Sequence, residues 1–192
     1  MKNLIFLILI LLSSSGCENC SDDGEVNNLL TDTERELIPF TSTTIVNFIN
    51  VNSETLPGQY DAKTNEIRDL DISNDEECFA TNIENELTIL EIAEQNLTIQ
   101  ISVGTDRNDN LGFAIDLIQD PTQRFVLLEC DGIVENLENL RKEITSHGFQ
   151  FTNVYVFTPC TENSVVQRIL YSSENGIELI EFADDTFLRL DL

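Results

Sequence analysis

Basic residues, histidine and tryptophan are scarce in this chain of 192 residues. Lys and Arg number 10 against 35 Asp and Glu, which gives a formal net charge of −25, and the chain has one His and no Trp. Nucleic-acid affinity comes mainly from Lys and Arg that displace phosphate counterions, so this charge excludes a nucleic-acid partner. A Ser or Cys nucleophile would have His147 alone as its base, and no Gly-x-Ser-x-Gly or phosphate-binding glycine motif is present. We therefore expect no enzyme and no cofactor.

The longest apolar run lies at the start of the chain. Lys2 precedes the apolar residues 4–12, and the small residues 13–16 lead to Cys17. An apolar run of roughly 7–15 residues followed by small residues is typical of a signal peptide, and it is shorter than the about 20 residues of a membrane-spanning helix. Residues 1–16 are therefore predicted to be a signal peptide.

The end of this segment resembles a bacterial lipobox, with Ser14 where the commonest lipobox has Leu. The resemblance implies acyl chains, palmitate among them, on Cys17, and hence a stable membrane anchor. An ordinary secretory signal followed by a chance cysteine is the alternative.

Residues 17–32 are polar and acidic and are predicted to form a flexible tether, because they contain too little apolar surface to bury. The run Ser21-Asp22-Asp23 resembles the acidic stretch of surface-exported Bacteroidetes lipoproteins. That resemblance implies an outer-membrane lipoprotein on the cell surface; a spacer of arbitrary sequence that faces the periplasm is the alternative.

Residues 33–192 are predicted to form a single β-rich globular domain. Leu97, Ile99, Ile101 and Val103 alternate with polar residues, which is typical of a strand with one buried face. Short connections between strands favour antiparallel pairing, so we expect a mainly β fold with a meandering antiparallel sheet, curved or half-barrel in shape. Further strands are predicted at 43–51, 77–81, 87–92, 111–118, 124–129, 150–158, 165–172, 177–182 and 186–190.

One segment departs from this alternation. Ile133, Val134, Leu137 and Leu140 recur at helical spacing, which predicts one short α-helix around 133–141. A hairpin is expected after it, with Gly148 at positive φ in the turn and His147 beside it in water.

The C-terminal third resembles the ending of uncharacterised Bacteroidetes (flavobacterial-type) envelope lipoproteins. In those proteins an "NVY" strand leads to a "YS..G" strand and turn, as Asn153-Val154-Tyr155 leads here to Tyr171-Ser172 and Gly176, and a closing hairpin follows. The resemblance covers about 45 residues and departs from the pattern at Leu170, Asp185 and Phe187. It implies secretion, lipidation and an antiparallel sheet, and it supplies no catalytic residue.

The cysteines suit an oxidising compartment. With Cys17 lipidated, four cysteines remain, and two of Cys78, Cys130 and Cys160 are predicted to form a disulfide, Cys130 with Cys160 being favoured. The segment Asp106, Asn108 and Asn110 has calcium-ligand spacing at alternate positions but lacks the remaining ligands of an EF-hand loop. A polar hairpin turn explains it more simply, and no metal site is predicted.

Two functions follow from these observations. The first is a non-enzymatic envelope lipoprotein whose β domain contacts an envelope protein or a glycan. The second is a carrier that holds an apolar ligand inside a curved sheet, as lipocalin-like or lipoprotein-carrier-like proteins do. A carrier needs an empty apolar cavity, whereas a binding module needs a packed core.

Overall fold

The structure is a computed structural model, and it describes residues 25–74, 77–118, 123–127, 133–134, 137–162 and 164–192. The predicted signal peptide at 1–16, the lipidation site Cys17 and the first part of the tether lie outside the described residues. Cys130 also lies outside them. The predictions for these residues stay predictions.

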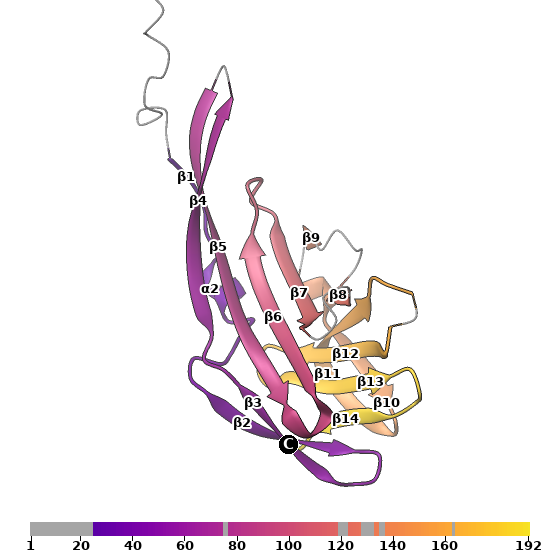
Figure 1. Cartoon of the computed structure of the whole chain (residues 1–192). Helices are drawn as coiled ribbons and strands as arrows, with labels where there is room; N and C mark the ends of the chain where they lie inside the picture. The colour runs from indigo at the N-terminus through magenta and orange to yellow at the C-terminus, as the bar shows by residue number, and fades with distance from the viewer. Residues whose placement is uncertain (1–24, 75–76, 119–122, 128–132, 135–136, 163) are drawn as a thin grey trace, which may run out of the picture.

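Ten of the described strands close into an antiparallel β-barrel (Figure 1). The mainly β, antiparallel prediction is confirmed, and the half-barrel is in fact closed, because the strand Leu97–Thr105 at one end of the order pairs with Glu77–Ile92 at the other. Around the barrel the strands lie in the order β5 (Glu77–Ile92), β3 (Thr55–Tyr60), β2 (Thr44–Asn50), β14 (Phe187–Leu190), β13 (Gly176–Phe182), β12 (Val166–Ser172), β11 (Phe149–Pro159), β8 (Arg124–Val126), β7 (Leu111–Leu117) and β6 (Leu97–Thr105).

Two strands extend the sheet beyond the barrel. β4 (Thr64–Asn74) pairs with β5 antiparallel, and β1 (Glu25–Asn28) pairs with β5 in parallel on its other side. Figure 1 shows β4 and β5 projecting together past the rest of the sheet. Of the shorter elements, β9 (Ile133–Val134) pairs with β7 and β10 (Lys142–Ser146) pairs with β11, while the 3-10 turns are η1 (Ala93–Gln95) and η2 (Glu138–Leu140).

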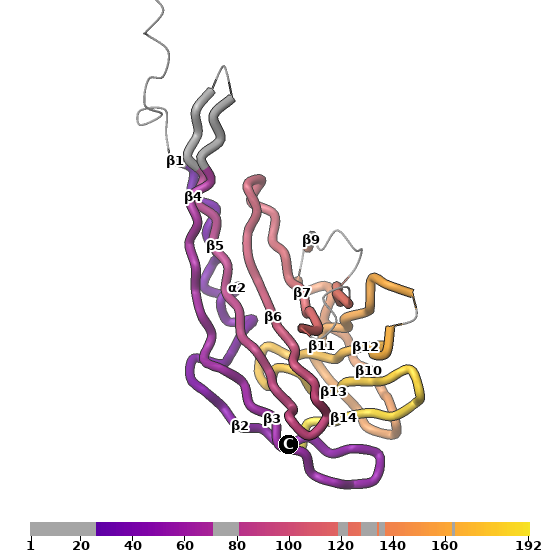
Figure 2. Tube along the Cα trace, in the orientation of Figure 1, coloured from indigo at the N-terminus to yellow at the C-terminus, as the bar shows by residue number. Residues whose placement is uncertain are grey.

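An N-terminal segment packs into the core of the barrel. Residues 29–41, which we call the plug segment, contain the helix α2 (Asp32–Arg35), whose start is capped by Thr31 and Glu34. Figure 2 shows this part of the trace beside β5. Phe40 stacks on Tyr60 with ring centroids 3.6 Å apart, and the plug residues Leu30, Leu37, Ile38 and Phe40 belong to the main hydrophobic core.

Alternate side chains of each strand point into the barrel. On nearly every strand these inward side chains are apolar. Phe113 on β7 makes edge-to-face contacts with Tyr155, Phe157 and Tyr171, with centroids 5.9, 5.0 and 5.4 Å away. These rings and the plug segment pack the described interior. The packed core is the feature that the binding-module hypothesis requires.

The helix predicted around 133–141 is wrong. Ile133–Val134 is a strand paired with β7, and Glu138–Leu140 is a 3-10 turn. Ile133 and Val134 pair with Gly112 and Leu111 in the sheet, so tertiary pairing overrides the helical spacing at these two residues. The hairpin expected after it is confirmed as β10–β11, with Gly148 at φ +81°.

The folded domain also begins earlier than residue 33. β1 starts at Glu25, and Leu30 is buried, so the later part of the predicted tether is part of the sheet and the core. Among the described residues, no helix is both long enough and apolar enough to cross a membrane.

Candidate binding groove

The register of five strands brings polar and small side chains together on the outside of the barrel. Residues directly opposite each other on neighbouring strands share a face. The outward rows across β4 to β8 are Glu66–Asn85–Gly104–Gly112, Leu87–Ser102–Ala114–Val126 and Ile89–Gln100–Asp116–Arg124.

This face is hollowed where its side chains are small. One hollow of about 250 Å³ and an adjoining one of about 310 Å³ share Asn85, Ser102, Thr105 and Arg124 in their walls. Gly104 is required here, because a Cβ at this position would lie 2.8 Å from Asn85 Oδ1 and 2.9 Å from the Glu84 carbonyl oxygen. We call the combined hollow the outer groove; its polar walls are Glu66, Arg68, Asn85, Gln100, Ser102, Thr105, Asp116 and Arg124.

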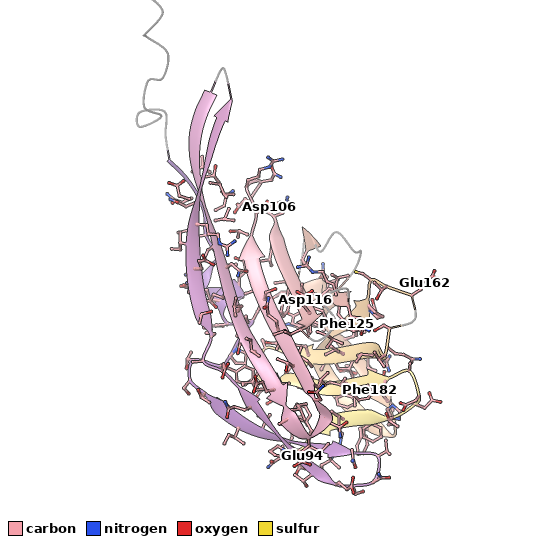
Figure 3. The ribbon with its side chains drawn as sticks, in the orientation of Figure 1. Glu94, Asp106, Asp116, Phe125, Glu162 and Phe182 are labelled. Atoms are coloured by element: carbon pink, nitrogen blue, oxygen red, sulfur yellow. The ribbon has the colours of Figure 1, made fainter. Side chains whose placement is uncertain are left out.

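Charges in the outer groove are paired. Asp116, labelled in Figure 3, lies with Oδ1 3.3 Å from Arg124 Nε, and its side chain is 25% exposed. Burial raises the pKa of Asp116, and Arg124 opposes that rise in part. Glu66 and Arg68 form a second, exposed pair at 2.7 Å. Asp106 also lines the groove, so three carboxylates stand against two guanidinium groups in a chain of net charge −25. Because both guanidinium groups are paired with carboxylates, the groove favours a neutral ligand over an anion.

The Asp106 side chain, at the rim of the groove, makes hydrogen bonds within the turn that it begins. Its Oδ1 accepts hydrogen bonds from the backbone N–H groups of Asn108 at 2.7 Å and Asn110 at 2.9 Å, and its Oδ2 accepts one from Asn110 Nδ2 at 3.0 Å. Burial raises the pKa of Asp106, but these hydrogen bonds outweigh it and leave the pKa below its usual value. The loop considered for calcium is therefore the polar turn between β6 and β7. In the described part of the chain, no group of three His, Cys, Asp or Glu side chains is placed to hold a metal ion.

Of the three cysteines that were candidates for a disulfide, the structure describes Cys160 in full. Cys160 follows β11 and is disulfide-bonded, and its backbone N–H donates to the Arg124 carbonyl at 2.8 Å. Cys78 lies in β5, but its side chain is outside the described set, as is all of Cys130. The choice of Cys130 as the partner of Cys160 stays a prediction.

His147 lies in the β10–β11 turn as expected, but its ring is not simply in water. The ring is 27% exposed, its Nε2 is 3.3 Å from Glu181 Oε1, and it packs on Phe187 at 4.5 Å. Glu181 also accepts hydrogen bonds from Arg168 and Ser146. This cluster fixes the hairpin to β12 and β13.

Sequence reasoning missed a second set of carboxylates, which point into the barrel from β5. Arg35 of α2 donates two hydrogen bonds to the buried Glu84, from Nε at 3.0 Å and from Nη2 at 2.6 Å. Lys63 donates to Glu86 at 2.7 Å and to the Arg35 carbonyl at 2.7 Å. No sequence signal distinguishes these two glutamates among the 35 acidic residues. They hold the plug segment in place.

Another hollow, of about 400 Å³, lies beside the plug segment. Its cations, Arg35 and Lys63, are the same ones that bind Glu84 and Glu86. Their donors are directed to structural partners, so this hollow is a weaker candidate than the outer groove.

Comparisons with protein families, with curated proteins and with solved structures find no match for this chain. Function is therefore inferred from the geometry of the barrel and its outer groove.

Proposed function

We propose that this chain is a lipid-anchored protein of the bacterial cell envelope whose barrel is a non-enzymatic binding module. The observation that carries the proposal is the location of free space. Aromatic side chains and the plug segment pack together in the described core, whereas two adjoining hollows among the described residues lie on the outside. A ligand or partner therefore binds from the outer surface.

The anchor follows from the front of the sequence. The lipobox-like residues before Cys17 and the acidic run after it support attachment to the outer membrane on the cell surface. Seven residues lie between Cys17 and Glu25, the first residue of β1, so the two are eight residue steps apart. A chain spans at most about 3.5 Å per residue, so β1 would start within about 28 Å of the acylated sulfur. The tether is short enough to hold the barrel close to the bilayer.

The outer groove suits a neutral glycan. Asn85 and Gln100 each offer both donors and an acceptor, and Ser102 offers a hydroxyl. The hydroxyl of Thr105 donates to the Asn28 carbonyl and accepts from the Glu84 N–H, so it serves the fold. Neighbouring sugar hydroxyls need donors and acceptors side by side, and the Asp116–Arg124 pair supplies both. Both guanidinium groups of the groove are paired and Asp106 adds a third carboxylate, so the groove has no net attraction for an anion.

The carrier hypothesis is supported by one observation, the closed barrel, an architecture that holds small ligands in other proteins. To act as a carrier, this barrel would have to release the plug segment. That release would break the Phe40–Tyr60 stack and the hydrogen bond from the Tyr171 hydroxyl to the Leu37 carbonyl. The geometry therefore favours the binding module.

Calorimetric titration tests the glycan site. The full-length chain, purified in a non-ionic detergent, is titrated with neutral oligosaccharides that contain glucose, galactose, mannose or N-acetylglucosamine. We expect one or more of them to bind, and Arg124→Ala and Asn85→Ala to weaken binding about tenfold or more.

Lys142→Ala is the matched control, because Lys142 is exposed on β10 and is not part of the groove. Binding that is unaffected by the groove variants, or no binding by any member of this set, would count against the proposal.

A further inference from the structure

The strand β4 is paired along one side only. Its register with β5 runs without interruption from Thr64↔Leu87 to Asn74↔Glu77. Within the described residues no strand pairs with its other side, and no backbone hydrogen bond outside the β5 ladder involves residues 64–74. Every second N–H and C=O of β4 therefore points away from the sheet without a described backbone partner.

This open edge is long and uncovered. Among the described strands with a neighbour on one side only, β4 has eleven residues, against five in β10, four in β1 and two in β9. Residues 64–69 are exposed on both faces of the strand. Ile67, an apolar side chain, is 57% exposed. No described element shields the edge.

Three usual protections of an edge strand are missing from β4. Natural edge strands are often blocked by charged side chains, by Lys above all, by Pro or by a bulge, and of these β4 has only charged side chains other than Lys. β4 contains neither Lys nor Pro, and its register with β5 has no shift. The rest of the barrel has no such edge because β5 and β6 close it.

Charge indicates which strand can be added. β4 carries Glu66, Asp69 and Asp71 against Arg68, and the whole chain carries −25. A second copy would bring the same acidic strand and the same net charge, so like charges would repel. A cationic strand is attracted instead.

We propose that the outer edge of β4 binds an extended Lys- or Arg-rich segment of another protein as an added strand. Main-chain hydrogen bonds to β4 supply affinity, and the acidic side chains select a cationic partner. The outer edge of β4 adjoins the outer groove, because Glu66 and Arg68 of β4 also line that groove, but the main-chain pairing does not depend on a glycan.

Hydrogen exchange measured by mass spectrometry tests the proposal on the full-length chain in non-ionic detergent. The probe is a capped nine-residue peptide of alternating Lys and Thr. The matched control peptide has the same charge with Pro in place of the central Thr residues, so it keeps the electrostatic attraction but cannot complete the ladder. We expect the first peptide to slow exchange in residues 64–70 about tenfold or more, and the second to leave it unchanged.

A protein variant gives an independent readout. Asp69→Lys is expected to weaken binding of the Lys–Thr peptide about tenfold, whereas Glu162→Lys, an exposed charge reversal on the loop after β11, leaves it unchanged. Three results would overturn the proposal: equal protection by both peptides, no protection by either, or protection of β4 that needs only a higher concentration of the chain itself. The last result would identify a second copy as the occupant.

Discussion

Arg35 and Glu84 lie 49 positions apart in the sequence and form a two-point ion pair, with Nε–Oε1 at 3.0 Å and Nη2–Oε2 at 2.6 Å. The Glu84 side chain is fully buried, and it also accepts hydrogen bonds from the Leu30 backbone and from Asn65. One carboxylate thus joins the plug segment, β4 and β5.

Replacing Glu84 with Gln is expected to lower the free energy of unfolding by about 2–3 kcal/mol, because a buried pair loses one of its charges. Urea denaturation followed by circular dichroism measures the change. Glu66→Gln is the control, since the Glu66–Arg68 pair is exposed, and it should leave the unfolding curve unchanged. Equal effects of the two substitutions would show that the Glu84 pair does not fix the plug segment.

Acid should destabilise the fold through two glutamates. The hydrogen bond from Arg35 is the main reason that the pKa of Glu84 is lowered. Burial raises the pKa of Glu181, but hydrogen bonds from Arg168 and Ser146 outweigh it, and the net pKa is lowered. A carboxyl group with a lowered folded pKa stabilises the fold above its unfolded pKa, and that contribution is lost as the pH falls through the folded pKa.

The free energy of unfolding should therefore fall as the pH drops below the ordinary glutamate value of 4.5. Urea midpoints measured from neutral pH downward give the profile. The double variant Glu84→Gln, Glu181→Gln should be less stable at neutral pH and lose less stability on acidification than the parent. Parallel profiles for the two proteins would contradict this assignment.

Gly176 and Gly148 provide a matched pair for testing how the plug is packed. Both have positive φ, +77° and +81°. A Cβ on Gly176 would lie 2.6 Å from Phe40 Cζ and 2.8 Å from Tyr60 Oη, whereas nothing lies within 4 Å of a Cβ on Gly148. Gly148→Ala should cost about 1 kcal/mol from backbone strain, and Gly176→Ala about 3 kcal/mol from strain and overpacking. Thermal or urea unfolding compares them, and equal costs would show that Phe40 does not pack where the structure places it.

The contribution of Asp116 to stability should change with pH in the opposite direction to that of Glu84. Burial raises its pKa, so its ionised form is disfavoured in the fold, and stability is lost as the pH rises through the raised pKa. Asp116→Asn is therefore expected to raise the urea midpoint at neutral pH while weakening glycan binding in the outer groove. Glu162→Gln, an exposed change, should alter neither. A lower midpoint for Asp116→Asn would show that the carboxylate serves stability instead of binding.

The sequence predicted the strands whose buried face alternates clearly. Leu97 to Val103 is the best case, and the following hairpin of β6 and β7 also agrees with its turn chemistry. The sequence could not predict that the barrel closes, because closure depends on pairs such as Leu190↔Phe48, which join the two ends of the domain. β4 was missed because residues 64–69 are exposed on both faces of the strand, which leaves no alternation to detect there.

The candidate site was harder to predict for a related reason. Asn85, Ser102 and Arg124 come from three strands and share the groove only through register. The short sequence patterns pointed elsewhere, to the Asp106 turn and to a helix around 133–141. A local pattern reports the conformation of its own segment, whereas this groove is a property of the whole sheet.

Native mass spectrometry of the full-length chain, purified from cells in mild detergent, tests the central claim that binding occurs outside a filled barrel. We predict the mass of a chain cleaved before Cys17 and acylated there, with no further apolar molecule bound. A non-covalent apolar ligand that co-purifies at one per chain, and is lost when the chain unfolds, would contradict the account and identify a carrier.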